Sequence, residues 1–280
     1  MAWVRRELDT LGIPPLRRFG QHFLVDKIVR DQLVKQAELK EHDTVVEVGP
    51  GLGFLTAALT AKAGRVIAIE KDRTLAKYLQ NRFLTHRNLT VVQGDALTFQ
   101  IPEQAKIVSS PPYNISSKLV LLILKSPFKL ASLLLQNEFA RRLIAVSGSP
   151  DYGRLTVMLQ SRAHAELHVT VPRTAFYPQP RVNSALVTIS PLAEAPKIRN
   201  ETLFAEMVRV LFTQRRKRLR GVLTKYLILR FPEDWKQMLD RTTIPEKCVF
   251  EASIQELVAL SNQIATASAD YGSKRDQRVD

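Results

Sequence analysis

The sequence predicts an α/β protein with a mostly parallel, seven-stranded sheet and a small all-helical C-terminal domain. Between residues 44 and 146, short uninterrupted apolar segments alternate with longer segments of helical periodicity. Apolar strands separated by helices are typical of a parallel sheet that is covered on both faces. A glycine-rich turn follows the first of these strands, and the patterns beyond residue 200 are helical.

The order of the elements follows from the apolar segments and the breaks between them. Two later β-rich segments, 163–171 and 185–190, are joined by a Pro-rich loop, so we expect an antiparallel hairpin at the sheet edge. The five strands before them are expected at 44–48, 65–69, 89–93, 106–109 and 130–136, and the accompanying helices at 27–37, 53–63, 72–84, 116–125 and 137–146.

Changes in composition predict three parts of the chain. The first includes a basic N-terminal arm with Arg17 and Arg18. The second is helical, with an interruption near Phe231-Pro232, because proline does not continue a helix. The third is a polar tail that we expect to be disordered. The predicted boundaries are 1–192 for the larger domain, 193–266 for the helical domain and 267–280 for the tail.

The chain is strongly basic, with a formal net charge of +14 and a pI near 10.1. Such a balance is typical of proteins that bind nucleic acid, because neutralising phosphates releases counterions. Anionic membranes are the competing partner. They usually recruit a basic amphipathic helix with exposed apolar residues, and we identify no such terminal segment. We therefore expect a nucleic-acid partner and no membrane.

Other features of the sequence bear on the cellular compartment of the protein and on whether it contains a disulfide or a metal. No apolar segment approaches the roughly 20 residues that a membrane-spanning helix requires. The N-terminal residues lack the pattern of a secretory signal. The single cysteine, Cys248, excludes an internal disulfide and a cysteine-rich zinc site. We expect a cytoplasmic protein without a metal, and nothing in the sequence requires more than a monomer.

A glycine-rich turn lies where the first strand passes into its helix, in the segment Glu47-Val-Gly49-Pro-Gly51-Leu-Gly53. Glycines at this position let the backbone approach a ligand closely. The third glycine comes one residue too early for the dinucleotide pattern. Glu47 is a poor neighbour for a pyrophosphate but a good one for an ammonium group. The turn therefore indicates a ligand other than a dinucleotide.

Two further acids end the next strands. Glu70 follows the glycine turn by about twenty residues, where a carboxylate can bind both hydroxyls of a ribose. Asp95 ends the following strand and can accept a hydrogen bond from an adenine amine. The alternative is that each carboxylate caps the following helix. Together with Glu47, they describe a pocket for S-adenosylmethionine, with no phosphate contact.

The tetrad Ser110-Pro111-Pro112-Tyr113 follows the strand at 106–109. Prolines fix φ and remove donors, so backbone carbonyls and the Ser110 hydroxyl stay free as acceptors. An aromatic ring lies beside them. Acceptors next to a stacking face suit a planar heterocycle with an exocyclic amine, although an ordinary loop would have the same composition.

These segments resemble the small-subunit rRNA adenine N6-dimethyltransferases, the kasugamycin-resistance type, in an archaeal or eukaryotic-like form. The resemblance covers about residues 15–265. It implies a Rossmann-like class I methyltransferase domain that dimethylates two adjacent adenosines near the 3′ end of small-subunit rRNA during subunit maturation. The segments that carry it are 18–26 (RFGQHFLVD), 46–53 (VEVGPGLG), 152–155 (YGRL), 176–184 (FYPQPRVNS) and 211–218 (LFTQRRKR).

The resemblance also implies roles for single residues. His22 stands where many members have Asn, and Ser110 stands where most have Asn. The serine side chain is shorter than that of asparagine, and we expect this difference to affect either the rate of methyl transfer or the efficiency of the second methylation. Tyr113 would stack on the adenine, with Phe176 on its other face or as a plain core residue of the hairpin. The implied catalytic residues are Ser110, Pro111, Pro112, Tyr113 and Phe176, and those for the cofactor are Gln21, His22, Leu24, Glu47, Gly49, Gly51, Gly53, Glu70, Lys71, Asp95, Ala96 and Ser110.

A basic segment in the C-terminal domain is the expected contact with the RNA backbone. We expect it inside a helix flanked by Arg209 and Lys225. The alternative is a solvated helix face, but no acids are interspersed among these cations. The residues are Arg215, Arg216, Lys217, Arg218 and Arg220.

Two other functions compete with this interpretation. Ser-Pro-Pro-Tyr is also a familiar loop of DNA amino-methyltransferases that act on cytosine N4 or adenine N6, although the helical C-terminal region is short for a domain that reads DNA sequence. The chain could also be a non-catalytic ribosome-assembly or transcription factor of the same fold. The retained acids Glu47, Glu70 and Asp95 argue against a lost activity.

Overall fold

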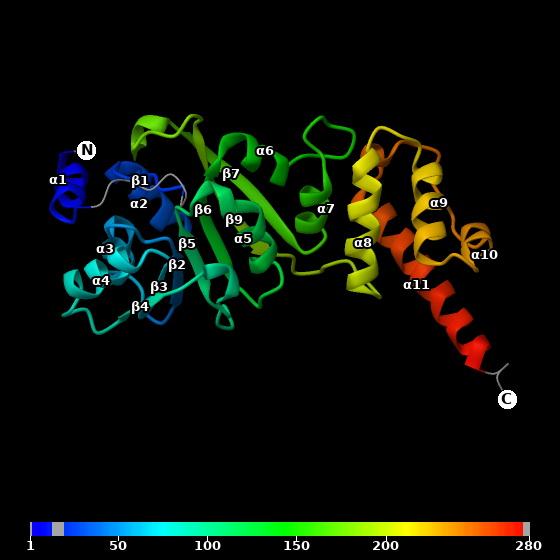
Figure 1. Ribbon diagram of the computed structural model, residues 1–280, viewed down its shortest axis with the longest axis horizontal. Coiled ribbons are helices and arrows are strands. Elements are labelled where there is room, and N and C mark those ends of the chain that lie inside the picture. Colours follow the sequence, from blue (N-terminus) through cyan, green and yellow to red (C-terminus); the bar gives the residue numbers. More distant parts are fainter. Residues whose placement is uncertain (1, 13–19, 277–280) are drawn as a thin grey trace. The chain divides into compact units, whose positions relative to one another are not determined.

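The computed structural model describes residues 2–12 and 20–276 (Figure 1). It divides into two compact units. Unit 1 contains residues 1–141 and 163–192, and unit 2 contains residues 142–162 and 193–280. The sequence placed 142–162 in the larger domain. These residues belong to unit 2 because the Tyr152 hydroxyl donates to the Ala252 carbonyl, 2.9 Å away, and Arg162 pairs with Glu201.

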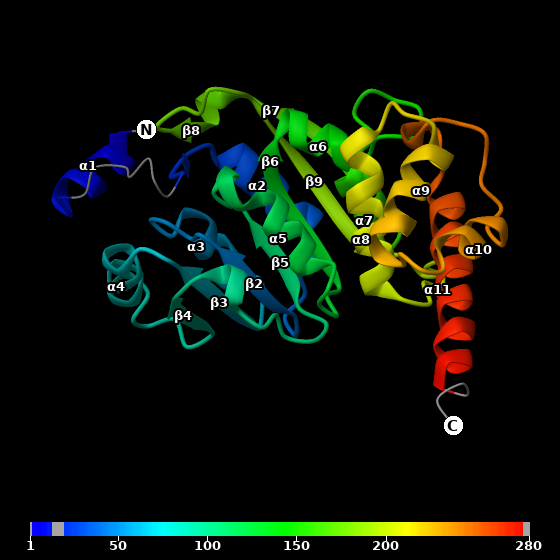
Figure 2. The same ribbon diagram turned by 45° about the vertical axis from the view of Figure 1, so that its right-hand side comes forward.

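Unit 1 is built on a seven-stranded sheet with the order β4-β3-β2-β5-β6-β9-β7 (Figure 2). The first five strands are parallel, and β9 is antiparallel to both β6 and β7. The predicted strand positions and the antiparallel hairpin at the edge are confirmed. The strands are β2 (Thr44–Val48), β3 (Arg65–Glu70), β4 (Leu89–Gln93), β5 (Lys106–Ser109), β6 (Leu130–Gln136), β7 (Ala163–Val171) and β9 (Ser184–Pro191).

Successive residues of the central strands are buried on opposite faces, as the apolar pattern predicted. Val108 belongs to the core cluster with Val29 and Leu55, whereas its neighbour Ile107 points to the other side and is also fully buried. A sheet with two buried faces needs helices on both. The helices of unit 1 after the N-terminal segment are α2 (Lys27–Gln36), α3 (Phe54–Thr60), α4 (Arg73–Arg82), α5 (Ser116–Ile123) and α6 (Asn137–Leu143), whose last two residues belong to unit 2.

Three elements of unit 1, one helix and two short strands, were not predicted from the sequence. Helix α1 (Ala2–Thr10) is amphipathic, but its apolar residues Val4 and Leu8 are buried within unit 1. Strand β1 (Phe23–Leu24) pairs with β8 (Phe176–Tyr177) in a separate antiparallel ribbon. This ribbon joins two motif segments that lie about 150 residues apart in the sequence. Two-residue strands have no periodicity to detect.

Unit 2 is helical, with α7 (Arg154–Gln160), α8 (Glu201–Leu211), α9 (Leu219–Arg230), α10 (Trp235–Asp240) and α11 (Ile254–Asp276). The interruption at Phe231-Pro232 separates α9 from α10, as expected. Helix α11 continues past Ala267, where the sequence analysis expected disorder. The buried residues Leu257, Leu260, Ile264 and Ala267 lie at helical spacing and hold the part of the helix before this point in the core of unit 2. None of the helices in the described ranges has the length and apolar character that a bilayer crossing requires.

Candidate active site

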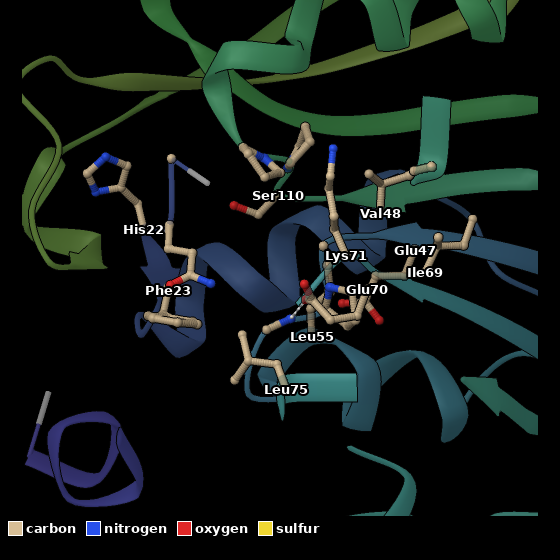
Figure 3. Close-up of a pocket in the computed structure, with 18 of the residues that line it drawn as sticks. His22, Phe23, Glu47, Val48, Leu55, Ile69, Glu70, Lys71, Leu75 and Ser110 are labelled. Atoms are coloured by element: carbon tan, nitrogen blue, oxygen red, sulfur yellow. Dashed lines mark hydrogen bonds between the residues drawn. The ribbon is translucent and has the colours of Figure 1, made fainter. Parts of the chain in front are cut away.

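A cavity of about 320 Å³ opens at the carboxyl ends of the parallel strands. The strand order reverses between β2 and β5, and open α/β sheets bind their ligands at such a switch point. Figure 3 shows Glu70, Lys71 and Ser110 around this cavity. The predicted residues that line it are Gln21, His22, Leu24, Glu47, Gly49, Gly51, Glu70, Lys71, Asp95, Ala96, Ser110, Pro111, Pro112 and Tyr113.

The glycine turn between β2 and α3 lies in close contact with two other segments of the site. Gly49 and Gly51 both have positive φ angles, 69° and 58°. A Cβ atom on Gly49 would lie 3.1 Å from the Pro112 Cδ, and one on Gly51 would lie 2.8 Å from the Phe23 Cδ1. Larger residues would therefore push the turn away from the tetrad and from β1.

Gly53 has a different role from the one that the sequence predicted. It does not line the cavity. Its φ is 82°, and a Cβ there would lie 2.5 Å from the Phe83 Cε2 and 2.8 Å from the Leu79 Cδ2. The glycine lets the start of α3 pack against α4, so the assignment of Gly53 to cofactor binding is corrected to helix packing.

Glu70 connects the end of β3 with the glycine turn. Its Oε2 accepts a hydrogen bond from the Gly51 N–H at 3.1 Å (Figure 3), and its Oε1 accepts one from the Asp72 N–H at 2.8 Å. Burial raises the pKa of this carboxyl. A carboxylate has about four acceptor positions, so Glu70 can hold the turn and still accept hydrogen bonds from a ligand's hydroxyl groups.

Glu47 lies at the base of the cavity and is 1% exposed. The Thr56 hydroxyl donates to its Oε2 at 2.7 Å. Burial, with a smaller contribution from the nearby Glu70 charge, raises the pKa of Glu47 to about 8. A cationic ligand group would favour the ionised form. The site can therefore stabilise positive charge at this point.

Asp95 serves as a helix cap and as part of the cavity wall. Its carboxylate accepts hydrogen bonds from the Lys71 Nζ at 2.8 Å and from the Leu97 N–H at 3.0 Å, at the start of a short 3-10 helix over Ala96–Thr98. The Lys71 hydrogen bond is the main cause of its lowered pKa. The capping alternative is thus correct for Asp95, and the residue lines the cavity as well.

The tetrad is fixed to the sheet from both ends. The Ser109 hydroxyl donates to the Val48 carbonyl at 2.6 Å and so ties the end of β5 to the end of β2. The Tyr113 hydroxyl and the Ser184 Oγ lie 2.5 Å apart. Burial raises the pKa of Tyr113, so its phenol stays protonated at neutral pH. Ser184 is the last residue of the motif at 176–184, and no role was predicted for it from the sequence.

His22 stacks on Tyr113, with ring centroids 5.6 Å apart and an interplanar angle of 27°. Its Nδ1 lies 2.7 Å from the Pro178 carbonyl. A carbonyl only accepts hydrogen bonds, so Nδ1 carries a proton and this contact fixes the ring. His22 therefore supports the aromatic ring of the tetrad, in addition to lining the cavity.

Phe176 does not occupy the place that the sequence predicted for a second stacking ring. It is 0% exposed and belongs to the core cluster with Leu134 and Leu186. Its ring meets Tyr113 edge-on, with centroids 6.5 Å apart and an angle of 72°. A ring without exposed surface cannot stack on a base without moving, so the structure corrects Phe176 to a core residue that packs against Tyr113.

Four of the five residues of the basic segment of unit 2 lie outside a helix, in contrast to the expectation, and Arg220 alone belongs to α9 (Leu219–Arg230). Residues 215–218 form a turn before α9 begins at Leu219. The Arg215 Nη2 donates to the Pro150 carbonyl at 2.7 Å, and its guanidinium lies 5.7 Å from the centre of the Phe250 ring. Arg215 is thus committed to packing within unit 2. Exposed cations remain at Arg216, Lys217, Arg218 and Arg220, and Arg17 and Arg18 of the predicted arm lie outside the described residues.

Comparison with known proteins identifies the family. The family model for ribosomal RNA adenine dimethylase matches residues 16–263. The chain belongs to this family. A relative from Methanosarcina mazei, described as a probable ribosomal RNA small subunit methyltransferase A, is 39% identical over 251 residues, and the match covers 88% of this chain and 92% of the relative. A protein of the same description from Thermococcus gammatolerans is 40% identical over 250 residues, 88% of each chain.

Solved structures agree with the dimethylase assignment. The chain resembles a dimethyladenosine transferase from Plasmodium falciparum with a TM-score of 0.77 and 26% identity, over 88% of this chain and 98% of that one. It resembles the 23S rRNA methyltransferase ErmE with a TM-score of 0.64 and 30% identity, over 87% and 99%. The larger unit therefore has the Rossmann-like methyltransferase fold that the sequence predicted.

Proposed function

We propose that this protein transfers methyl groups from S-adenosylmethionine to the N6 amines of two adjacent adenosines near the 3′ end of small-subunit rRNA, and that this occurs during subunit maturation. The proposal depends on one observation, which is that the predicted cofactor cavity and the predicted catalytic tetrad adjoin each other in a chain of the dimethylase family. A cavity with acids at the ends of β2, β3 and β4 meets the acceptor-rich tetrad at the end of β5.

The residues of the cavity fit S-adenosylmethionine. Its volume of about 320 Å³ is at the lower end of the range for small-molecule sites. Buried Glu47 suits the ammonium end, Glu70 suits the ribose hydroxyls, and Asp95 suits the adenine amine. Gln21 and Leu24 of the N-terminal motif line the same cavity, and we assign them to the methionine end. No step of this assignment requires a phosphate contact.

The chemistry follows from the acceptors of the tetrad. When bound, S-adenosylmethionine supplies an electrophilic methyl group. The lone pair of an adenine N6 is delocalised into the ring, so the amine is a weak nucleophile. The Ser110 hydroxyl and the Pro111 carbonyl accept hydrogen bonds from its N–H groups and favour a pyramidal, more nucleophilic nitrogen. Tyr113 stacks on the base, which contributes about 1–3 kcal/mol, and most of the rate gain comes from orientation.

Proton transfer needs no dedicated base in this scheme. The methylated nitrogen is strongly acidic and loses its proton to water after the transfer. The base must leave its stack to reach the tetrad, so we expect an unpaired or flipped adenosine as the substrate. The exposed cations of unit 2, Arg216 and Lys217 among them, are the proposed contacts with the RNA backbone.

The large ribosomal subunit is the alternative substrate to the small subunit. ErmE, which the chain resembles at 30% identity, is described as a 23S rRNA methyltransferase. The curated relatives at 39–40% identity are described as small-subunit enzymes. We favour the small subunit because these relatives are more similar in sequence at comparable coverage of both chains.

The test is incubation of the pure protein with labelled S-adenosylmethionine and four separate substrates. They are unmethylated small subunits, unmethylated large subunits, duplex DNA, and small subunits already dimethylated as a control. We expect label in N6,N6-dimethyladenosine from the first substrate alone. Label in the large subunit would favour the ErmE-like alternative, and label in DNA would favour a DNA enzyme. Cofactor binding without transfer to any substrate would support a non-catalytic factor.

A further inference from the structure

Helix α1 lies outside the part of the chain that matches the family, which begins at residue 16. Its Trp3 nevertheless lines the cavity at the ends of the strands. We propose that α1 forms an additional wall of the cofactor site and that Trp3 contacts bound S-adenosylmethionine. This inference rests on the proposed function, because it concerns the ligand of the same cavity.

The apolar contacts of α1 place it against the cavity wall itself. Val4 is 0% exposed and Leu8 is 3% exposed. They pack in one cluster with Phe23, Leu52 and Leu75, and each of these three residues also lines the cavity. Three residues that hold α1 in place are therefore also residues of the cavity wall.

Trp3 is held between an aromatic ring and a cation. Its ring centroid lies 5.7 Å from that of Phe54, the first residue of α3 after the glycine turn, at an angle of 40°. The Arg82 guanidinium lies 5.7 Å from the centre of the Trp3 ring, within the range of a cation–π contact. These contacts come from α3 and α4, the two helices that follow the first two strands of the site. They place Trp3 beside the glycine turn.

A hydrogen-bond chain fixes α1 on its polar side. The Tyr78 hydroxyl donates to the Glu7 Oε2 at 2.8 Å, and the Arg82 Nη1 donates to the Tyr78 hydroxyl at 2.6 Å. Arg82 thus contacts both Tyr78 and Trp3. Apolar packing, ring contacts and hydrogen bonds all hold the helix in the same position. A helix that only shielded the surface would not need to place a tryptophan in the cavity.

The chain contains two tryptophans, Trp3 and Trp235, and Trp235 belongs to α10 in unit 2. Trp235→Phe therefore leaves Trp3 as the sole indole reporter. We expect the emission of this variant to change on titration with S-adenosylmethionine, with a midpoint equal to the calorimetric Kd. The reciprocal variant, Trp3→Phe, keeps only Trp235 and should show no such change.

Affinity provides the second measurement. Trp3→Ala should raise the Kd for S-adenosylmethionine about tenfold, which corresponds to about 1.4 kcal/mol, while Trp235→Ala, the matched control, leaves it unchanged. Val4 and Leu8 still anchor α1 in the Trp3 variant, and circular dichroism verifies its fold. The inference is overturned if the Trp3 emission of Trp235→Phe does not change and the Kd of Trp3→Ala lies within twofold of the wild-type value. In that case the wild-type protein still binds the cofactor, and the proposed function is not affected. Absence of calorimetric binding by the wild-type protein would overturn both.

Discussion

Replacing Glu47 by glutamine should change how the stability of the protein depends on pH. The carboxyl is 1% exposed, and burial raises its pKa from the ordinary value of 4.5 to about 8. Between these values the folded protein keeps a proton that the unfolded chain has lost. The contribution of Glu47 to stability is therefore complete below pH 4.5 and is lost as the pH rises toward 8.

The size of the effect follows from the same interval. At about 1.36 kcal/mol per pH unit, it amounts to at most about 5 kcal/mol of unfolding free energy. Water that enters the open cavity will solvate the carboxylate, so we expect about 2–3 kcal/mol. Glutamine keeps an acceptor for the Thr56 hydroxyl and has no charge to bury. Glu47→Gln should therefore be more stable than the wild type at pH 8 by about this amount, and similar to it at pH 5.

The assay is urea unfolding, followed by circular dichroism from pH 5 to pH 8.5. Burial also raises the pKa of Glu70, so this carboxyl also makes the protein less stable as the pH rises. Both proteins contain Glu70, so the difference between their unfolding free energies reports the contribution of Glu47 alone. Glu103→Gln, which removes an exposed carboxyl, is the control. Parallel stability curves for the wild type and Glu47→Gln would refute the argument, because they would mean that Glu47 ionises normally in the fold.

Further predictions concern the cofactor, the tetrad and the RNA surface. At pH 7, binding of the cationic cofactor should ionise Glu47 and release up to one proton. Calorimetry in two buffers of different ionisation enthalpy detects this proton, and the Glu47→Gln variant, which lacks the carboxyl, should not release it. Ser184→Ala removes the partner of the Tyr113 hydroxyl and should lower kcat about tenfold with little change in the Kd for the cofactor. A rise of about tenfold in this Kd beside the fall in kcat would contradict a role limited to the tetrad. Ser110→Asn should raise the ratio of dimethylated to monomethylated adenosine in single-turnover digests, and an unchanged ratio would show that the shorter side chain is not limiting. Neutralising Arg216, Lys217 and Arg220 should weaken RNA binding and reduce its salt slope by up to about 0.7–0.9 per lost contact, whereas a triple variant of exposed cations at Lys35, Lys62 and Arg65 should leave the slope unchanged.

The elements that the sequence predicted well are those with strong local patterns. Strands such as Thr44–Val48 and Lys106–Ser109 contain adjacent apolar residues, Val45-Val46 and Ile107-Val108, and side chains that alternate across a strand then require burial on both faces. The acids at the strand ends were found because parallel strands bring their carboxyl ends to one edge of the sheet. The same reasoning failed for Gly53, whose partners Leu79 and Phe83 lie on another helix.

Errors arose where a residue's role depends on distant partners. Phe176 fits an aromatic signature, yet it is buried because β8 pairs with β1 and packs into the core. Arg215 belongs to a run of cations, yet its guanidinium is occupied by the Pro150 carbonyl. The charge pattern alone cannot separate it from its exposed neighbours, since all of them are adjacent in the sequence.

The amino-acid sequence by itself determined the seven strands of the sheet, the helices between the parallel strands, the glycine turn, the three strand-end acids and the tetrad, because hydrophobic periodicity and turn chemistry act over a few residues. Only the tertiary structure decided that Ser184 holds Tyr113, that residues 142–162 join unit 2, and that Trp3 reaches the cavity. These contacts join residues far apart in the sequence, and they form only when the packing of the sheet and helices brings the segments together.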